Sequence, residues 1–307
     1  MDHLKPVRNA LIKKLWEKYR LSVDHAALVD HHLKTITGRT IILDHFALID
    51  LPSAHTGIPT LSAIFSEIGF TQCGADYLPD KQNDFIWMAS IDAPGQPAEL
   101  ALPQVVLADF RLEELPPPIK KIILQYTAYI KPSPINEIKK QIRQLSDGDC
   151  NAIEAVVDLI YGYIMKKDWP LPTIKEFRTV QEYNELLAWV LVFGSIPNHF
   201  AASMHFSHPH FQQLDDLNAF LRDKLNITLN TIDGEIKGSR EMGIRQSSTL
   251  APSQKIALSD GEIMIPSQFM EFVWRFSMNE KNPVYWDDYY TGFIAKNANR
   301  VVESLYT

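Results

Sequence analysis

Two short stretches of the chain place a histidine in the same apolar setting. Residues 44–47 read DHFA and residues 198–201 read NHFA, so His45 and His199 share their neighbours. Two neutral imidazoles suit Fe, Zn, Ni or Cu better than Mg or Ca. A single His on an apolar strand is more often a hydrogen-bonded core residue than a ligand, so neither stretch is informative alone.

The two stretches open the same order of predicted elements. Residues 41–51 and 198–206 are strand-like, and helical spacing follows over 60–70 and 211–225. The two helices end at nearly equal distances from the preceding histidines. The repeat therefore predicts two copies of a β-α-β-β-β module. The remaining strand-like runs are 74–78, 84–91 and 104–112 in the first copy, and 227–232, 242–250, 255–260 and 268–276 in the second.

A third ligand is predicted on the last of these runs. Glu271 lies in the middle of the otherwise apolar stretch 268–276, where a carboxylate is costly unless it is paired or bound to a metal. If the two modules pair about a pseudo-twofold axis, His45 and His199 converge on one cavity. Two His and one carboxylate form the facial triad of non-haem Fe(II) oxygenases. The alternative is an ion pair between Glu271 and Arg275, which share a strand face.

The predicted fold class is α+β, with two β-α-β-β-β modules forming a curved sheet around a metal site. Helical periodicity before the first module predicts N-terminal helices, and a Pro-interrupted stretch between the modules predicts an insert of three or four helices. The aromatic, amphipathic tail is expected to pack onto the body. One domain, 1–307, is expected, with segments 1–38 (N-terminal helices), 39–113 (first module), 114–196 (helical insert), 197–276 (second module) and 277–307 (C-terminal tail).

Composition narrows the class of protein. The chain has 307 residues, 46% of them hydrophobic, and a formal net charge of −7, so we expect neither nucleic acid nor a membrane as a partner. No apolar run is long enough for a transmembrane helix, and no signal peptide is expected. Only two cysteines are present, Cys73 and Cys150, which excludes a disulfide framework and favours a cytoplasmic location.

Longer segments resemble a known family. The stretches DHFALIDLPSAHTGIPTLSAIFSEIGF, DYLPDKQNDFIWM, IPNHFAASMHF, GIRQSSTLAP and QFMEFVWRF are similar to a shorter branch of the 2-oxoadipate dioxygenase/decarboxylase family, in the vicinal-oxygen-chelate superfamily. The resemblance covers roughly residues 5–280. It implies Fe(II) held by His45, His199 and Glu271, although another divalent metal would also suit this ligand set. It also implies O₂ and a 2-oxo acid as substrates, with 2-oxoadipate converted to 2-hydroxyglutarate and CO₂ in lysine catabolism.

One departure from the family affects the substrate. The resemblance implies an Arg four residues after the first His, to bind the substrate carboxylate, and this chain has Ile49 there. We expect Arg245 to supply the cation instead, or else Arg275; an ordinary ion pair is the alternative for both. Ser203, Ser247 and Ser248 are predicted to line the pocket. Asp44 and Asn198 are not expected to orient the adjacent histidines, because neighbouring strand residues face opposite ways.

Two rival functions fit the same scaffold. A metal-dependent isomerase or lyase of the glyoxalase type would need no O₂ and would accept Zn, Ni or Co. A non-catalytic protein would bind a small ligand without turning it over. A homodimer formed through the tail is the weaker alternative to a tail that packs onto its own chain.

Overall fold

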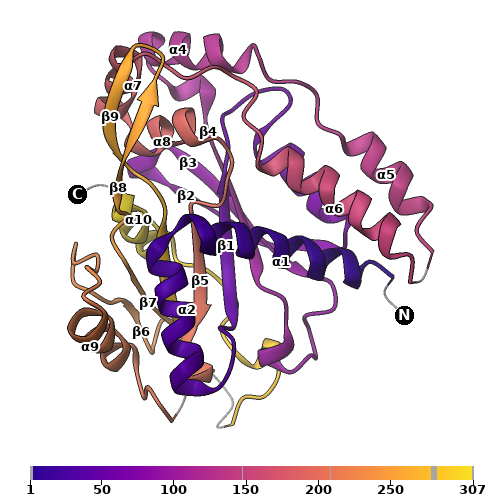
Figure 1. Ribbon diagram of the computed structural model, residues 1–307, viewed down its shortest axis with the longest axis vertical. Coiled ribbons are helices and arrows are strands. Elements are labelled where there is room, and N and C mark those ends of the chain that lie inside the picture. Colours follow the sequence, from indigo (N-terminus) through magenta and orange to yellow (C-terminus); the bar gives the residue numbers. More distant parts are fainter. Residues whose placement is uncertain (1–2, 147, 208, 278–281, 306–307) are drawn as a thin grey trace.

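A curled eight-stranded sheet forms the centre of the molecule, with helices packed around it (Figure 1). The computed structural model describes residues 3–146, 148–207, 209–277 and 282–305. The strand order is β2-β3-β4-β1-β5-β10-β7-β6. The predicted α+β class with a curved sheet is confirmed. Among the described helices, none combines the length and the apolar character needed to cross a bilayer.

The first module occupies one half of the sheet. Its first strand, β1, pairs in parallel with its last strand, β4, and the two middle strands follow outward. The helix α3 connects β1 to β2 and packs on β4. The elements are β1 (Leu43–Ile49), α3 (Gly57–Glu67), β2 (Phe70–Leu78), β3 (Asn83–Ser90) and β4 (Gln104–Phe110).

The second module repeats this arrangement in the other half. Its first strand, β5, pairs in parallel with its last, β10, and β7 and β6 follow outward. The two first strands, β1 and β5, pair antiparallel at the centre, so the halves are related by a local twofold. The elements are β5 (His199–Ser203), α9 (Leu214–Leu225), β6 (Lys237–Ser239), β7 (Ile244–Ser248) and β10 (Phe269–Arg275).

The second module departs from the sequence prediction at three points, the first being that β6 lies outside every predicted strand-like run. The run 227–232 forms no strand and contributes one isolated bridge, between Leu229 and Thr249. The run 255–260 falls largely in β8 (Ser253–Leu258), which pairs with β9 (Gly261–Pro266) in a separate hairpin. Most side chains of this hairpin are exposed or half-buried, so it projects from the sheet instead of joining it.

The described part of the insert holds five helices where three or four were predicted. The predicted last helix is two helices, because Asn184 leaves the helical conformation (φ −155°) and caps the second one. Its side-chain oxygen accepts a hydrogen bond from the backbone N–H of Leu187 at 3.0 Å. The helices outside the modules are α1 (Lys5–Ser22), α2 (Asp24–Thr37), α4 (Pro117–Thr127), α5 (Ile135–Arg143), α6 (Cys150–Ile164), α7 (Ile174–Tyr183), α8 (Glu185–Phe193) and α10 (Ala295–Val302).

The two faces of the sheet are buried against different helices. On one face, Phe46 and Phe200 belong to a core shared with α1 and α2, and Figure 1 shows α1 crossing β1 and β5. On the other face, Ile49 belongs to a second core that includes α8 and α10. Because side chains alternate along a strand, the histidine of β1 points toward this second face.

A buried carboxylate secures the turn from β1 into α3. Asp50 accepts backbone N–H groups from Leu51 at 2.9 Å and Gly57 at 3.2 Å. Position 57 requires glycine, because its φ is +79° and an added Cβ would lie 2.3 Å from Asp109 Oδ2. Burial raises the pKa of Asp50 from 3.8 to about 7 despite the two N–H donors, and the Asp109 carboxylate adds to this effect.

Asp50 should make stability fall as the pH rises. Its pKa is higher in the folded protein, so the folded state holds more protons between about pH 4 and pH 7. Unfolding free energy should therefore drop through that window. Between pH 5 and pH 8 this group accounts for a loss on the order of 3 kcal/mol. In urea denaturation, Asp50→Asn should show a shallower pH dependence than the wild type; equal slopes would contradict the assignment.

Candidate metal centre

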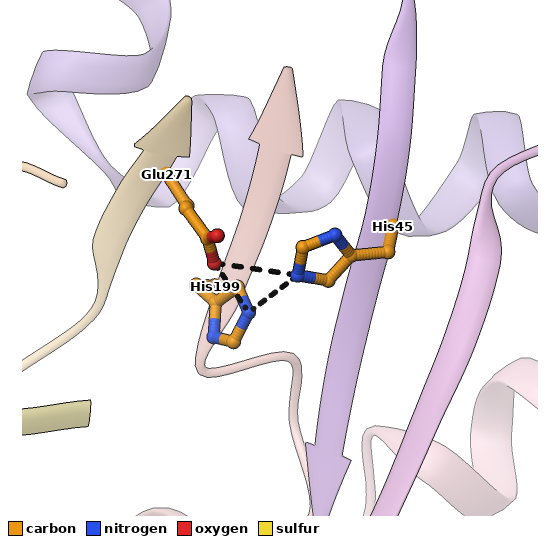
Figure 2. Close-up of side chains that lie close together, drawn as sticks. All are labelled: His45, His199 and Glu271. Carbon is orange, nitrogen blue, oxygen red and sulfur yellow. Dashed lines mark hydrogen bonds and ion pairs between the residues drawn. The ribbon is translucent and has the colours of Figure 1, made fainter. Parts of the chain in front are cut away.

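Three side chains meet at the centre of the sheet (Figure 2). The Nε2 atoms of His45 and His199 lie 3.3 Å apart, and each lies 3.3 Å from Oε2 of Glu271. The three residues are 2%, 6% and 1% exposed. They form the one group of three or more potential metal ligands found in the described part of the chain.

Strand register explains the convergence. His45 on β1 is paired with Ala201 on β5, and Ala201 is paired with Glu271 on β10. The small side chain at 201 leaves the space between the outer two residues open. His199 lies two residues before Ala201 and points to the same face, so it completes a triangle.

The charge balance of the three groups favours a cation between them. Burial opposes the charged form of His45, but the carboxylates of Glu271 and Asp44 raise its pKa. Burial lowers the pKa of His199 to about 3. Burial also works against the Glu271 carboxylate, yet the two imidazoles hold its pKa below the ordinary value. A divalent ion would replace the proton that this cluster attracts.

The spacing of the ligand atoms fits one metal ion. With metal–ligand bonds of ~2.1 Å, adjacent ligand atoms lie ~3.0 Å apart at octahedral angles and ~3.4 Å apart at tetrahedral angles. The observed 3.3 Å separations fall within this range. Two imidazoles and a carboxylate suit Fe(II) and also Zn(II), so the donor set fits a metal without selecting one.

Asp44 orients His45, contrary to the sequence prediction. Its Oδ1 lies 2.8 Å from Nδ1 of His45, which leaves Nε2 facing the cluster. The expectation of opposite faces was wrong because the β1–β5 pairing shifts register between Leu43 and His45. A bulge of this kind breaks the alternation and turns one extra side chain toward its neighbour.

Arg275 lies behind this pair instead of in the cavity. Its guanidinium binds Asp44 through two hydrogen bonds of 2.8 Å, so the ion pair that Arg275 forms is with Asp44 and not with Glu271. It also donates to the carbonyls of Tyr290 and Gly292. Burial opposes ionisation of Asp44, but Arg275 and His45 hold the pKa of that carboxyl well below its usual range.

His199 is held differently. Its ring stacks on Phe269 at 4.8 Å, and its Nδ1 is buried with no protein partner. Glu271 receives a hydrogen bond on Oε1 from Nε2 of Gln246 at 2.7 Å. The amide of Asn198 is fully buried, and neither its oxygen nor its nitrogen has a protein partner.

A cavity opens on one side of the three ligands. The cavity volume is about 50 Å³, several times the ~10–15 Å³ that one water needs. The C-terminal segment and one insert helix form its far wall. Besides the three ligands, the lining residues are Ala47, Ile49, Leu78, Asn83, Phe85, Val106, Ala108, Leu186, Asn198, Gln246, Phe293, Ala298, Val301 and Val302.

None of the five residues predicted to bind substrate lines this cavity. Arg245 forms an ion pair with Asp215 at 3.0 Å, on the opposite side of β7 from Gln246. Arg275 is engaged by Asp44, as described above. The three serines bond elsewhere: Ser203 to Asp44, Ser247 to Asn218 and Ser248 to Ser304.

Sequence reasoning missed the lining that comes from distant parts of the chain. Gln246 could have been found, because alternation along β7 sets it opposite to Arg245 and Ser247. Asn198 was set aside because strand alternation turns it away from His199. Asn198 precedes β5, however, so the alternation of that strand does not apply to it. No local pattern indicates that Phe293 and α10 would close the cavity.

The structure thus combines two paired β-α-β-β-β modules with a buried His-His-Glu set where the modules meet. The family model for 2-oxoadipate dioxygenase/decarboxylase matches residues 8–304, and the chain belongs to this family.

Several known proteins are similar to this chain. A chloroplastic 2-oxoadipate dioxygenase/decarboxylase of Arabidopsis thaliana is 26% identical over 284 residues, which cover 89% of this chain and 71% of the relative. The crystal structure of hydroxyglutarate synthase from Oryza sativa, in complex with 2-oxoadipate, has the same fold, with a TM-score of 0.78, 23% identity and coverage of 98% and 93%. A structure from Shewanella frigidimarina, named as a putative hydrolase, has a TM-score of 0.70, 28% identity and coverage of 94% and 98%.

Proposed function

We propose that this chain is an Fe(II)-dependent dioxygenase that decarboxylates and hydroxylates a 2-oxo acid. The observation that carries the proposal is the buried triangle of His45, His199 and Glu271 facing a cavity, in a chain of this family. The family name makes 2-oxoadipate the reference substrate. A role in lysine catabolism depends on that substrate and stays a prediction, as does a cytoplasmic location.

The overall reaction balances without a second organic substrate. The bond between C1 and C2 of the 2-oxo acid breaks, and C1 leaves as CO₂. One oxygen atom of O₂ enters the new carboxylate at C2, and the other becomes a hydroxyl on C3. 2-Oxoadipate plus O₂ thus gives 2-hydroxyglutarate plus CO₂, and the substrate supplies all the electrons. When bound, Fe(II) supplies the reactivity toward O₂ that protein side chains lack.

The side chains of this chain position the reaction. Asp44 fixes the ring of His45, and Gln246 fixes the carboxylate of Glu271. The Nδ2 of Asn198 has no protein partner and is free to donate to the carboxylate or keto oxygen of a substrate beside the ligands. Phe293 and α10 cover part of the cavity with apolar side chains, which limits the access of water to the reacting groups.

Oxygen consumption tests the proposal directly. Anaerobically Fe(II)-loaded protein, given a 2-oxo acid and then O₂, should take up O₂ and release an equal amount of CO₂. His199→Ala should remove both. Metal-loaded protein that changes the 2-oxo acid without consuming O₂ would support the isomerase or lyase alternative. Protein that binds the acid without any turnover would support the non-catalytic one.

Asn198→Leu should affect stability and substrate binding in opposite directions. The change removes a buried amide that bonds no protein group, so the ligand-free protein should gain about 1–3 kcal/mol of unfolding free energy. The KM for the 2-oxo acid should rise about 10-fold, the cost of one substrate hydrogen bond to a charged group.

Asn83→Leu is the matched control for this prediction. Asn83 also lines the cavity, but its Nδ2 donates to the carbonyl of Asp109 at 2.9 Å, so the same substitution should destabilise the protein. Urea denaturation and steady-state kinetics on both variants make the comparison. Equal destabilisation by the two substitutions would contradict the role assigned to Asn198.

A further inference from the structure

The cavity is polar at one end and apolar at the other. The polar end holds the metal-centre side chains with Asn198 and Gln246, and all of these except His45 come from the second module. Eleven of the seventeen lining residues are apolar. They come from the first module, from Leu186 of α8 and from the C-terminal segment.

The duplicated fold shows that this asymmetry comes from the residues and not from the backbone. Glu271 on β10 is paired with Ala201 of the neighbouring first strand, and the equivalent pairing in the first module joins Val106 to Ala47. Val273 of β10 is paired with Gln246 of β7, and the equivalent pairing in the first module joins Ala108 to Phe85. Phe85 therefore occupies the place of Gln246. The first module thus presents hydrocarbon where the second presents a carboxylate and an amide.

No cation serves the apolar end among the residues that the structure describes around the cavity. Neither Lys nor Arg lines it. Asn83 is the polar residue there, and its Nδ2 is occupied by the carbonyl of Asp109. A carboxylate placed at this end would be buried without a counter-ion, which is strongly unfavourable.

The C-terminal segment completes the apolar wall. Phe293 packs edge-on against His45 at 4.8 Å and against Trp87 at 5.6 Å. Ala298, Val301 and Val302 of α10 continue the wall. A ligand with its 2-oxo acid group at the metal centre would therefore extend its chain into a space lined by hydrocarbon apart from Asn83.

We propose that the substrate is a 2-oxo acid with a single carboxylate and an uncharged, apolar chain. This inference rests on the proposed function and narrows its substrate class. The polar end of the cavity takes the carboxylate and keto oxygens, and the apolar end takes an alkyl chain. The atom balance is unchanged: 2-oxohexanoate plus O₂ gives 2-hydroxypentanoate plus CO₂.

A matched pair of ligands tests the inference. 2-Oxohexanoate and 2-oxoadipate have the same carbon chain and differ only in a terminal methyl or carboxylate group. Calorimetric titration of Zn(II)-loaded protein measures binding without turnover, because Zn(II) has no redox chemistry. 2-Oxohexanoate should bind at least about 100-fold more tightly, given the cost of burying an unpaired carboxylate. Hexanoate, which lacks the keto oxygen, should bind weakly.

Ile49→Arg should invert the preference. Ile49 lines the apolar end, in register with Ala108 and through it with Phe85. A guanidinium there would pair with the distal carboxylate of 2-oxoadipate, so the dicarboxylate should become the tighter ligand. Ile49→Met keeps the site uncharged and should preserve the wild-type order. The comparison in the wild type stands even where the Arg variant does not fold.

The outcomes separate this inference from the proposed function. Wild-type protein that binds 2-oxoadipate as tightly as 2-oxohexanoate would overturn the inference and leave the dioxygenase proposal standing. Tight binding of 2-oxohexanoate without O₂ uptake by the Fe(II) form would support the inference and remove the dioxygenase proposal. Equal binding of hexanoate and 2-oxohexanoate would overturn both.

Discussion

Glu271→Gln is expected to leave the protein folded and to abolish metal retention. The amide keeps the shape of the side chain but removes the one carboxylate that touches both imidazoles, at a position only 1% exposed. A dication would then be buried against neutral ligands alone. Losing a group that only hydrogen-bonds a metal ligand typically lowers metal affinity about 10–100-fold. Because Glu271 is itself a proposed ligand, the loss should be larger, and O₂ uptake should fall to background.

Glu262→Gln supplies the control, because it makes the same chemical change at an exposed site on β9, where Glu262 pairs with Lys255. Competition with a chromophoric chelator gives the metal affinity, and mass spectrometry of the eluted metal gives the content. Thermal unfolding of the metal-free forms verifies that both variants are folded. A folded Glu271→Gln variant that binds metal like the wild type would remove Glu271 from the ligand set.

Sequence alone predicted the three clustered residues because each is a polar residue in an apolar, strand-like stretch. His45 and His199 recur in one pattern at the start of duplicated elements, and Glu271 is an acid in an apolar strand. Such signals survive without knowledge of the fold, since polar groups on buried strands are costly unless used. The module repeat then supplied the fold class, because two copies of one unit bury a common face.

Sequence alone could not predict the groups that surround these three. The bulge at Asp44 is a property of the pairing between β1 and β5, and strand alternation pointed the other way. Arg245 carries the positive charge expected of a substrate-binding residue, but the side chain that lines the cavity is that of the neighbouring Gln246. Phe293 reaches the cavity from more than 90 residues beyond His199, and contacts at such separation leave no periodic trace in the chain.

The Asp44–Arg275 pair explains why the acid beside His45 stays ionised. Both side chains are buried, at 3% and 7% exposure, and joined by two 2.8 Å hydrogen bonds. Arg275 also satisfies the carbonyls of Tyr290 and Gly292 just before Phe293. One guanidinium therefore links the orientation of a ligand to the segment that closes the cavity.

Arg275→Met should be among the most destabilising single changes. It leaves Asp44 as a buried charge without its counter-ion, and breaking a buried pair in this way costs about 3–5 kcal/mol. It also leaves the half-buried carbonyls of Tyr290 and Gly292 without their donor. Urea denaturation should show this loss in metal-free protein, where metal binding adds nothing. An unfolding free energy within about 1 kcal/mol of the wild type would show that the pair is not stabilising in this site.

The double variant Asp44→Asn with Arg275→Met separates stability from orientation. Neutralising Asp44 removes the unpaired charge, so the double variant should recover part of the stability lost in the single one. It should still bind metal about 10–100-fold more weakly than the wild type, because a neutral amide polarises and orients the His45 ring less well than a carboxylate does. Recovered stability together with wild-type metal affinity would mean that Asp44 stabilises the fold and does not orient His45 for metal binding. Recovered stability with weakened affinity is the result expected if the bulge at Asp44 exists to aim His45.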